Sequence, residues 1–332
     1  SSALGQYNLN FTAQSGPISL ANGNVSINAN GGTINLMANT MTFVPSTGTN
    51  TNGIQSLGGN LNIQPYSTNT TIGIGSSTTG TLMIPTVVWG GSTTGAAPTS
   101  ANIGNAVFKS GFNMITVGSA AQTGYLYVNQ VNTDYLVFSS PLTLQTSNAA
   151  TYIIYVRGTL QDAYTTLGNT YASATLTIKG LDNSTTIRND AGLVTIRTSG
   201  SQAYTGWYLQ GGNLVTTTSG AGSNITFTNF SNAVGSYGFT ATAYSNIIFK
   251  PNSVVSLAGA AVNTVTAQNG NVIFGAGFTN TAQGNTFTFQ GLMLDASAGN
   301  VTMNTGAGSL TLISDNFNLF APGNSFTGTT NG

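Results

Sequence analysis

The amino-acid sequence predicts an all-β fold, and within that class a β-solenoid whose short strands stack along one axis. Apolar residues alternate with polar ones in short bursts, which is the period of a half-buried strand. A phrase of Gly or Ser, then Asn, then apolar-polar-apolar returns along the chain. Glutamate, a strong helix former, is absent, while 43 glycines and many Thr, Asn and Ser residues favour strands and turns.

Residues 1–86 are expected to form the first coils. Their apolar pairs each enclose one polar residue, and successive pairs begin seven to nine residues apart: Leu9/Phe11, Ile18/Leu20, Val25/Ile27, Ile34/Leu36 and Met41/Phe43. Asn-Gly, Gly-Asn and Gly-Gly steps lie between strands, because Asn and Gly adopt turn conformations that most residues avoid. Three short strands and three turns per coil fit this spacing.

Residues 87–171 depart from this pattern and predict a decorated or inserted β region. The Asn-led phrase is lost and tyrosines become frequent, although Gly124–Val128 and Thr151–Val156 still alternate as strands do. Tyrosine offers amphipathic contact area at low entropic cost. The region is therefore a candidate ligand surface, formed by Tyr125, Tyr127, Tyr135, Tyr152 and Tyr155. The alternative is that these rings pack in the core or against cross-strand neighbours.

Residues 172–332 return to the solenoid pattern and end in a tail. The Asn-led phrase begins at Ser223, Ser245, Gly270 and Gly299, which are 22, 25 and 29 residues apart. One coil cannot bury its inward Val, Ile, Leu and Phe side chains alone, but a stack of coils can. The whole chain then makes about 12 coils, a rod about 60 Å long at about 4.8 Å per layer.

A longer pattern of strands runs through residues 59–128. Its segments are Asn60–Pro65, Thr71–Gly75, Gly80–Ile84, Gly111–Gly118 and Gly124–Val128. This pattern resembles a segment of filamentous-haemagglutinin-like exoproteins and related large secreted adhesins. The resemblance implies a right-handed parallel β-helix, secretion by a prokaryote, and a role in adhesion, matrix or surface filaments.

The composition excludes several classes of function. Six basic and six acidic residues cancel and form no basic stripe, so we expect no nucleic-acid partner. No apolar run reaches the roughly 18 residues that a membrane helix needs, so we expect no membrane insertion. Without His or Cys, the chain lacks the base of the usual nucleophilic triad and the usual ligands of zinc. We expect no metal and no cofactor.

One cluster of charges supports an enzymatic alternative. It consists of Asp182, Arg188, Asp190 and Arg197. Asp182 and Asp190 are the candidate carboxylates of a polysaccharide-degrading β-helix enzyme, because glycoside hydrolysis uses a pair of carboxyl groups. The plainer interpretation is a surface turn with ion pairs worth under about 1 kcal/mol. On that interpretation the chain is not an enzyme, and no catalytic residue is assigned.

The two ends of the rod are the candidate assembly surfaces. Tyr7, Leu9 and Phe11 alternate near one end, and Phe317, Leu319 and Phe320 lie near the other. The end of a β-helix exposes a strand edge that invites pairing, and pairing between unlike ends gives filaments.

We therefore expect a secreted, extracellular structural protein of the cell surface or a biofilm, a filament or adhesin subunit that assembles end to end. Its partners would be copies of itself, a host or neighbouring cell surface, or glycans. The alternative is a carbohydrate- or receptor-binding module from a large secreted adhesin.

Overall fold

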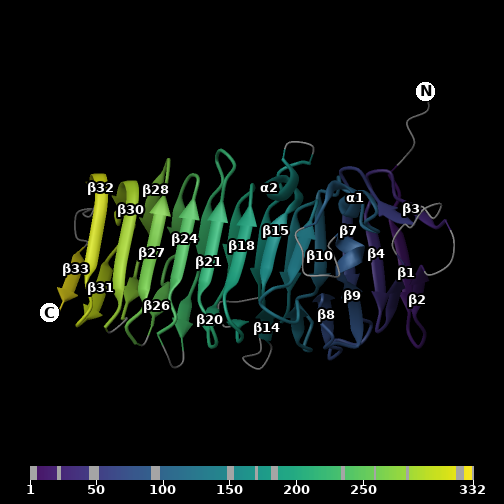
Figure 1. Cartoon of the computed structure of the whole chain (residues 1–332), viewed down its shortest axis with the longest axis horizontal. Coiled ribbons are helices and arrows are strands. Elements are labelled where there is room, and N and C mark those ends of the chain that lie inside the picture. Colours follow the sequence, from purple (N-terminus) through teal and green to yellow (C-terminus); the bar gives the residue numbers. More distant parts are fainter. Residues whose placement is uncertain are drawn as a thin grey trace.

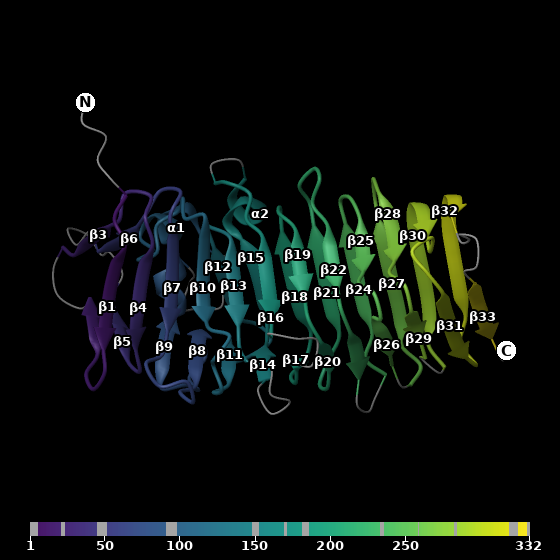
Figure 2. The same ribbon diagram turned by 180° about the vertical axis from the view of Figure 1, so that it is seen from behind.

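The computed structural model of the chain is an all-β solenoid of about 11 turns, with 5% of its residues in helices. Parallel strands lie side by side along the long axis of the molecule (Figures 1 and 2). The prediction of a parallel β-solenoid is confirmed, and the turn count lies close to the expected 12. The structure describes residues 6–20, 24–44, 52–90, 98–147, 153–168, 171–180, 186–232, 236–257, 259–281, 284–318 and 325–330.

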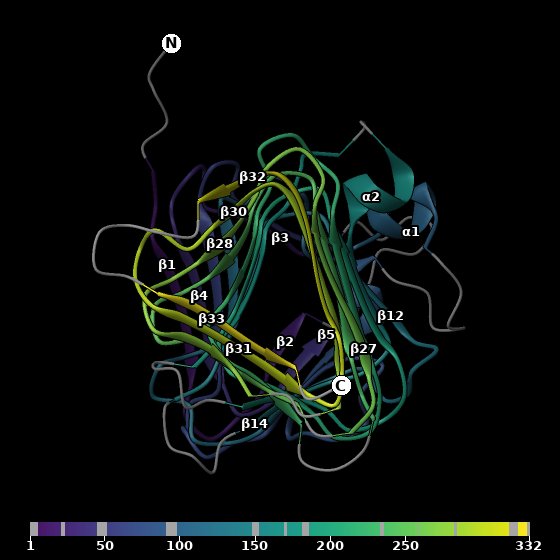
Figure 3. The same ribbon diagram turned by 90° about the vertical axis from the view of Figure 1, so that its left-hand side faces the viewer.

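Each regular turn contributes one strand to each of three faces, so the cross-section is roughly triangular (Figure 3). Face 1 consists of β1 (Leu9–Ala13), β4 (Ile34–Ala38), β7 (Asn60–Gln64), β10 (Met114–Gly118), β13 (Leu142–Gln145), β16 (Leu176–Lys179), β19 (Gln202–Tyr204), β22 (Ile225–Phe227), β25 (Ile247–Phe249), β28 (Asn271–Phe274), and the second halves of β30 (Thr286–Asp295) and β32 (Leu310–Asn318).

The first halves of β30 and β32 belong to face 2, because both strands continue across the corner between the two faces. The other strands of face 2 are β3 (Ser26–Asn28), β6 (Gly53–Gln55), β12 (Tyr135–Phe138), β15 (Thr159–Asp162), β18 (Val194–Thr198), β21 (Leu214–Thr218), β24 (Phe239–Ala243) and β27 (Val262–Ala267).

Face 3 closes the triangle. It consists of β2 (Ile18–Leu20), β5 (Met41–Phe43), β9 (Leu82–Pro85), β8 (Ile72–Gly75), β11 (Leu126–Val128), β14 (Ile153–Val156), β17 (Thr186–Asn189), β20 (Trp207–Leu209), β23 (Phe230–Asn232), β26 (Val254–Ser256), β29 (Phe278–Asn280), β31 (Val301–Gly306) and β33 (Phe326–Thr330).

The lumen is filled by the inward members of the alternating strands. In β4 and β21, for example, every second side chain is buried, as the period-two pattern requires. Aliphatic residues dominate the first half of the lumen, whereas phenylalanines stack in the second half. The rings of Phe227, Phe249 and Phe274 follow one another at centroid distances of 5.7 and 5.8 Å. Such continuous stacking is how each layer covers the next.

The corners use the turn chemistry that the sequence predicts. Asn30, Asn129 and Asn252 have positive φ angles of 46°, 61° and 59°, the left-handed conformation that Asn tolerates better than most residues. Glycine is also required where layers touch. A Cβ atom on Gly212 would lie 1.7 Å from the carbonyl oxygen of Gly192 in the preceding layer, so only glycine fits that corner.

The described residues contain three short helices. These are the 3-10 helix η1 (Thr86–Trp89), and the α-helices α1 (Ser100–Gly104) and α2 (Ala163–Leu167). Both α-helices project from the outside of the rod at one corner (Figure 3). No helix of the described chain is long and apolar enough to cross a membrane.

In one stretch of the chain, the order of the strands along the rod differs from their order in the sequence. After β8 the chain turns back, and β9 pairs with β8 on the side where β5 lies. On face 2, residues 107–109 likewise lie beside β6, which is far from them in the sequence. Ile54 N in β6 donates to Val107 O at 2.7 Å, and Phe108 N donates to Val88 O of η1 at 3.1 Å. Faces 2 and 3 therefore gain one layer between β4 and β7 that face 1 lacks, since β4 pairs directly with β7 there.

Candidate assembly ends and tyrosine cluster

The first strand of face 1 has an open edge. β1 pairs with β4, and no other ladder is formed by β1 within the described residues. Leu9 and Phe11 lie in the lumen columns that the buried Ile34 and Leu36 continue. Phe11 is nevertheless 38% exposed, because no layer of the described chain lies beyond β1. Tyr7, just before the strand, is also exposed, so all three predicted residues lie at this end of the rod.

The opposite end exposes the same kind of surface. The second half of β32 pairs with β30, which places Phe317 opposite the fully buried Leu294. Phe317 itself is 49% exposed, since it belongs to the last described layer of face 1. The other two residues predicted for this end, Leu319 and Phe320, lie outside the described residues.

An amide ladder begins at the N-terminal end of face 1. Asn35 Nδ2 donates to Asn10 Oδ1 at 2.7 Å, and Asn62 Nδ2 donates to Asn35 Oδ1 at 2.8 Å. At the far end of the same column Asn318 Nδ2 donates to Asp295 Oδ1 at 3.2 Å. Every one of these amide groups donates toward the N-terminal end, so the column has a direction.

Three of the predicted ligand-surface tyrosines form one cluster on face 3. The rings of Tyr127 and Tyr155 are opposite each other on neighbouring strands, 4.7 Å apart and nearly parallel at 3°. The ring of Tyr125 is tilted against both of these rings, and its centroid lies 6.1 Å from that of Tyr127 and 6.0 Å from that of Tyr155. Tyr135 does not join them, because it begins β12 on face 2. Tyr152 lies outside the described residues.

The cluster is flanked by charge. Arg157 Nε and Nη2 each donate at 2.8 Å to one carboxylate oxygen of Asp190, which is the bidentate geometry favoured by guanidinium and carboxylate. This bond raises the pKa of Arg157. Burial, with Tyr155 and Tyr125 nearby, raises the pKa of the Tyr127 hydroxyl.

The described residues contain only one of the two predicted catalytic carboxylates, Asp190. Asp190 is bonded to Arg157, and Asp182 lies outside the described residues. Arg188, from the same sequence cluster, lies over the ring of Tyr208 at 5.4 Å. Its partner in the cluster, Arg197, is an exposed residue of β18 on face 2. In the described part of the chain, no group of three or more Asp side chains could hold a metal ion.

Sequence reasoning gave no role to Asp162, which is fully buried. Its Oδ1 accepts from Thr165 N at 2.9 Å and so caps α2. Its Oδ2 accepts from Ala174 N at 3.2 Å, from Ser199 N at 3.0 Å and from the Ser199 hydroxyl. One carboxylate therefore joins a strand end, a helix and the corner of the next layer. The available signal was an Asp directly before a short helix-compatible segment.

A second buried polar group lies inside the lumen. The Tyr204 hydroxyl donates to Gln202 Oε1 at 2.7 Å and lies 3.1 Å from the Thr216 hydroxyl. Burial raises the pKa of Tyr204 far above that of an exposed phenol. These groups satisfy one another, as buried polar groups must.

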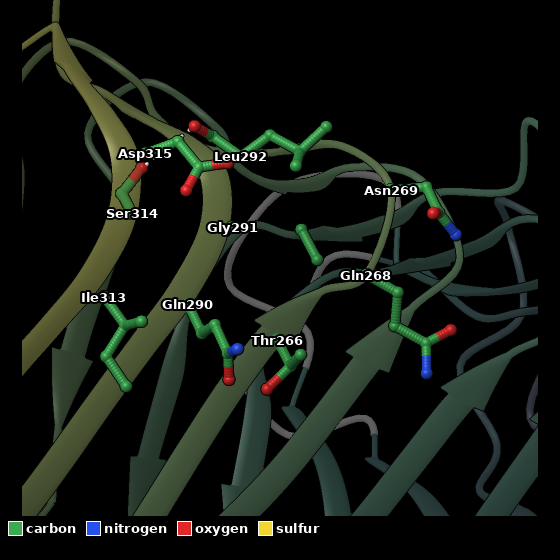
Figure 4. Close-up of a pocket in the computed structure, with 10 residues that line it drawn as sticks. Thr266, Gln268, Asn269, Gln290, Gly291, Leu292, Ile313, Ser314 and Asp315 are labelled. Atoms are coloured by element: carbon green, nitrogen blue, oxygen red, sulfur yellow. Dashed lines mark hydrogen bonds between the residues drawn. The ribbon is translucent and has the colours of Figure 1, made fainter.

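A shallow hollow of about 460 Å³ lies at the corner between faces 1 and 2 near the C-terminal end. Figure 4 shows Gln268, Gln290 and Thr266 along one side and Ser314 and Asp315 along the other. Amides, hydroxyls and one carboxylate can form hydrogen bonds with a ligand. A single carboxylate cannot supply the acid and base pair that glycoside hydrolysis uses.

Comparison with protein-family models, with curated proteins and with solved structures finds no match. The class of protein is therefore stated from the fold alone. The protein is a β-solenoid rod with an aromatic cluster on one face and with apolar lumen side chains exposed at each described end of face 1.

Proposed function

We propose that this chain is a structural subunit of an extracellular surface filament or adhesin, and that it assembles end to end by stacking of strands. The observation that supports this function most strongly is the exposure of Phe11 and Phe317 in lumen columns that are otherwise buried. Repeat proteins that remain monomeric cover their terminal layers with polar caps. An open apolar end with free strand edges instead favours pairing with another chain.

The geometry of the ends favours a filament over a closed oligomer. The N-terminal end presents β1 and the C-terminal end presents β32, so the two surfaces differ. Contacts between unlike surfaces are heterologous, and they propagate unless a rotation closes them into a ring. The strands lie across the long axis of the rod and stack along it, so each added copy lengthens the rod (Figure 1).

The extracellular setting follows from the resemblance of residues 59–128 to filamentous-haemagglutinin-like exoproteins. The composition supports the same setting. With six basic and six acidic residues in 332, and no cysteine, the chain has little that changes with pH, salt or redox conditions outside a cell.

Electron microscopy and sedimentation of the purified chain test this function. Fibres longer than one rod, increasing with protein concentration, are expected. Phe11→Lys or Phe317→Lys should abolish them, because either change places a charge in the joint, where desolvation is costly. Leu57→Lys is the matched control, since Leu57 is 81% exposed away from the lumen. Monodisperse single rods, or end variants that polymerise like the control, would contradict the proposal.

The tyrosine cluster favours a second candidate function, a ligand-binding module of an adhesin. Tyr125, Tyr127 and Tyr155 present a compact aromatic edge beside Arg157, a composition suited to sugar rings or protein surfaces. Binding to immobilised glycans should weaken at least about tenfold in the Tyr127→Ala variant if a ligand docks there. Tyr135→Ala, on another face, is the control. Equal binding by both variants would exclude the cluster.

A further inference from the structure

Face 1 carries an unbroken register from one end of the rod to the other. Eleven successive parallel pairings join β1 to β32 without a shift. Two columns of side chains can therefore be followed over the whole length. The outward column is Asn10, Asn35, Asn62, Thr116, Thr143, Thr177, Ala203, Thr226, Ile248, Ile273, Asp295 and Asn318. The adjacent lumen column is Leu9, Ile34, Leu61, Ile115, Leu142, Leu176, Gln202, Ile225, Ile247, Val272, Leu294 and Phe317.

The two ends of the outward column have complementary hydrogen-bonding groups. Asn10 accepts through Oδ1 from the next layer, and its Nδ2 has no partner among the described residues. Asn318 donates through Nδ2 to the previous layer, and its Oδ1 has no partner there. Because the amides point in one direction, a free donor ends the column at Asn10 and a free acceptor ends it at Asn318.

The two ends of the lumen column are complementary in another sense. Leu9 and Phe317 terminate a column whose interior members are buried, and no layer among the described residues covers either of them. Stacking the N-terminal end of one copy on the C-terminal end of another covers both residues. The same movement brings the donor of Asn10 to the acceptor of Asn318.

We propose that the occupant of each open end is a second copy of this chain in one specific register. β1 of the following copy pairs in parallel with the second half of β32 of the preceding copy. Asn10 then lies opposite Asn318, and Leu9 lies opposite Phe317. This inference rests on the proposed end-to-end assembly and adds the register of the joint to it.

Two neighbouring registers are excluded by different arguments. A slip of one residue sets the outward Asn10 of one copy opposite the inward Phe317 of the other, because successive side chains point to opposite faces, so the solvent side of one copy would meet the lumen of the next. A slip of two residues still sets one asparagine opposite another, since Asn316 would then face Asn10. However, it displaces one triangular cross-section against the other by about 6.6 Å along face 1. That displacement uncovers the lumen along faces 2 and 3, where the strands would no longer stack.

Disulfide cross-linking distinguishes these registers, and the chain contains no native cysteine. In the proposed register the Cα atoms of residues 10 and 318 are about 4.8 Å apart, which a disulfide can span. In the same register residues 10 and 316 are about 8 Å apart, beyond the limit of about 7 Å. The test protein is the full chain with Asn10→Cys and Asn318→Cys. The control carries Asn10→Cys and Asn316→Cys.

Mild oxidation of the test protein should give a thiol-reversible ladder of multimers on a denaturing gel, at least about tenfold faster than the control. A mixture of the two single variants, Asn10→Cys and Asn318→Cys, should give only mixed dimers. Homodimers of either single variant would show like ends meeting and would overturn the proposal.

Electron microscopy of the same samples separates two kinds of failure. Fibres without the 10–318 cross-link, or with a faster 10–316 cross-link, would overturn the register and leave end-to-end assembly standing. Absence of both fibres and cross-links would overturn the assembly and the register together.

Discussion

Replacing Asp162 by asparagine keeps the shape of the side chain and removes its ability to accept on both oxygens. Among the described residues, both oxygens accept from donors: Thr165 N on one, and Ala174 N, Ser199 N and the Ser199 hydroxyl on the other. The less costly orientation of the amide turns its NH2 group toward Thr165 N. The helix cap, worth about 1 kcal/mol, is then lost. The three remaining bonds lose their charge, at about 0.5–1 kcal/mol each.

The expected loss of stability is therefore about 2.5–4 kcal/mol. Urea unfolding followed by fluorescence of the buried Trp89 and Trp207 measures it globally. Hydrogen exchange of the Ser199 amide measures it locally, with an expected acceleration of about 60- to 900-fold. Asp315→Asn, a change at an exposed carboxylate, is the control and should stay within about 0.5 kcal/mol. An Asp162→Asn variant as stable as this control would refute the role assigned to the carboxylate.

Three further predictions concern the lumen, the corners and pH. Phe249→Ala should cost about 3–5 kcal/mol in urea unfolding, because its ring is fully buried among other phenylalanines; Leu57→Ala, at an exposed side chain, should cost almost nothing. Gly212→Ala should lower the melting temperature, since its Cβ would overlap the preceding layer, whereas Gly16→Ala meets nothing within 4 Å and should melt like the parent. Stability should be level up to about pH 10 and fall above it, because the raised pKa of Tyr204 means that the folded state holds this proton more tightly than the unfolded state does. Urea midpoints across the alkaline range, read beside phenolate absorbance, check this dependence, and a flat profile would contradict it.

The fold was predictable from the sequence because a solenoid repeats one local rule. Alternation in pairs such as Ile34/Leu36 gives strands with one buried side, and Asn and Gly give the corners. The out-of-order layer could not be predicted in the same way. Leu82 and Ile84 alternate like any other rung, and local alternation does not say which neighbour a strand chooses. The two α-helices are single turns held by the caps Thr99 and Asp162, too short to leave a periodic signal.

The candidate sites were predictable in part for the same reason. Tyr125, Tyr127 and Tyr155 gather because their strands are neighbours on face 3, whereas Tyr135 follows a corner and reaches face 2. Sequence spacing does not show on which side of a corner a residue falls. The residues at the ends of the rod were identifiable from their place in the chain. The match between Asn10 and Asn318 required the register of every layer between them.

The chain turns back after β8 toward the N-terminal end of the rod. As a result, β9 and residues 107–109 lie on the N-terminal side of β7 and β8, although they follow both strands in the sequence. Peeling from the N-terminus can release β1 to β6 coil by coil, but β7 and β8 remain held because later chain lies under them. Peeling from the C-terminus meets no such obstacle until it arrives at the same place. Under tension along the rod, the part of the chain from β7 to residue 109 should resist and then yield in a single step, while the coils on either side of it unravel gradually.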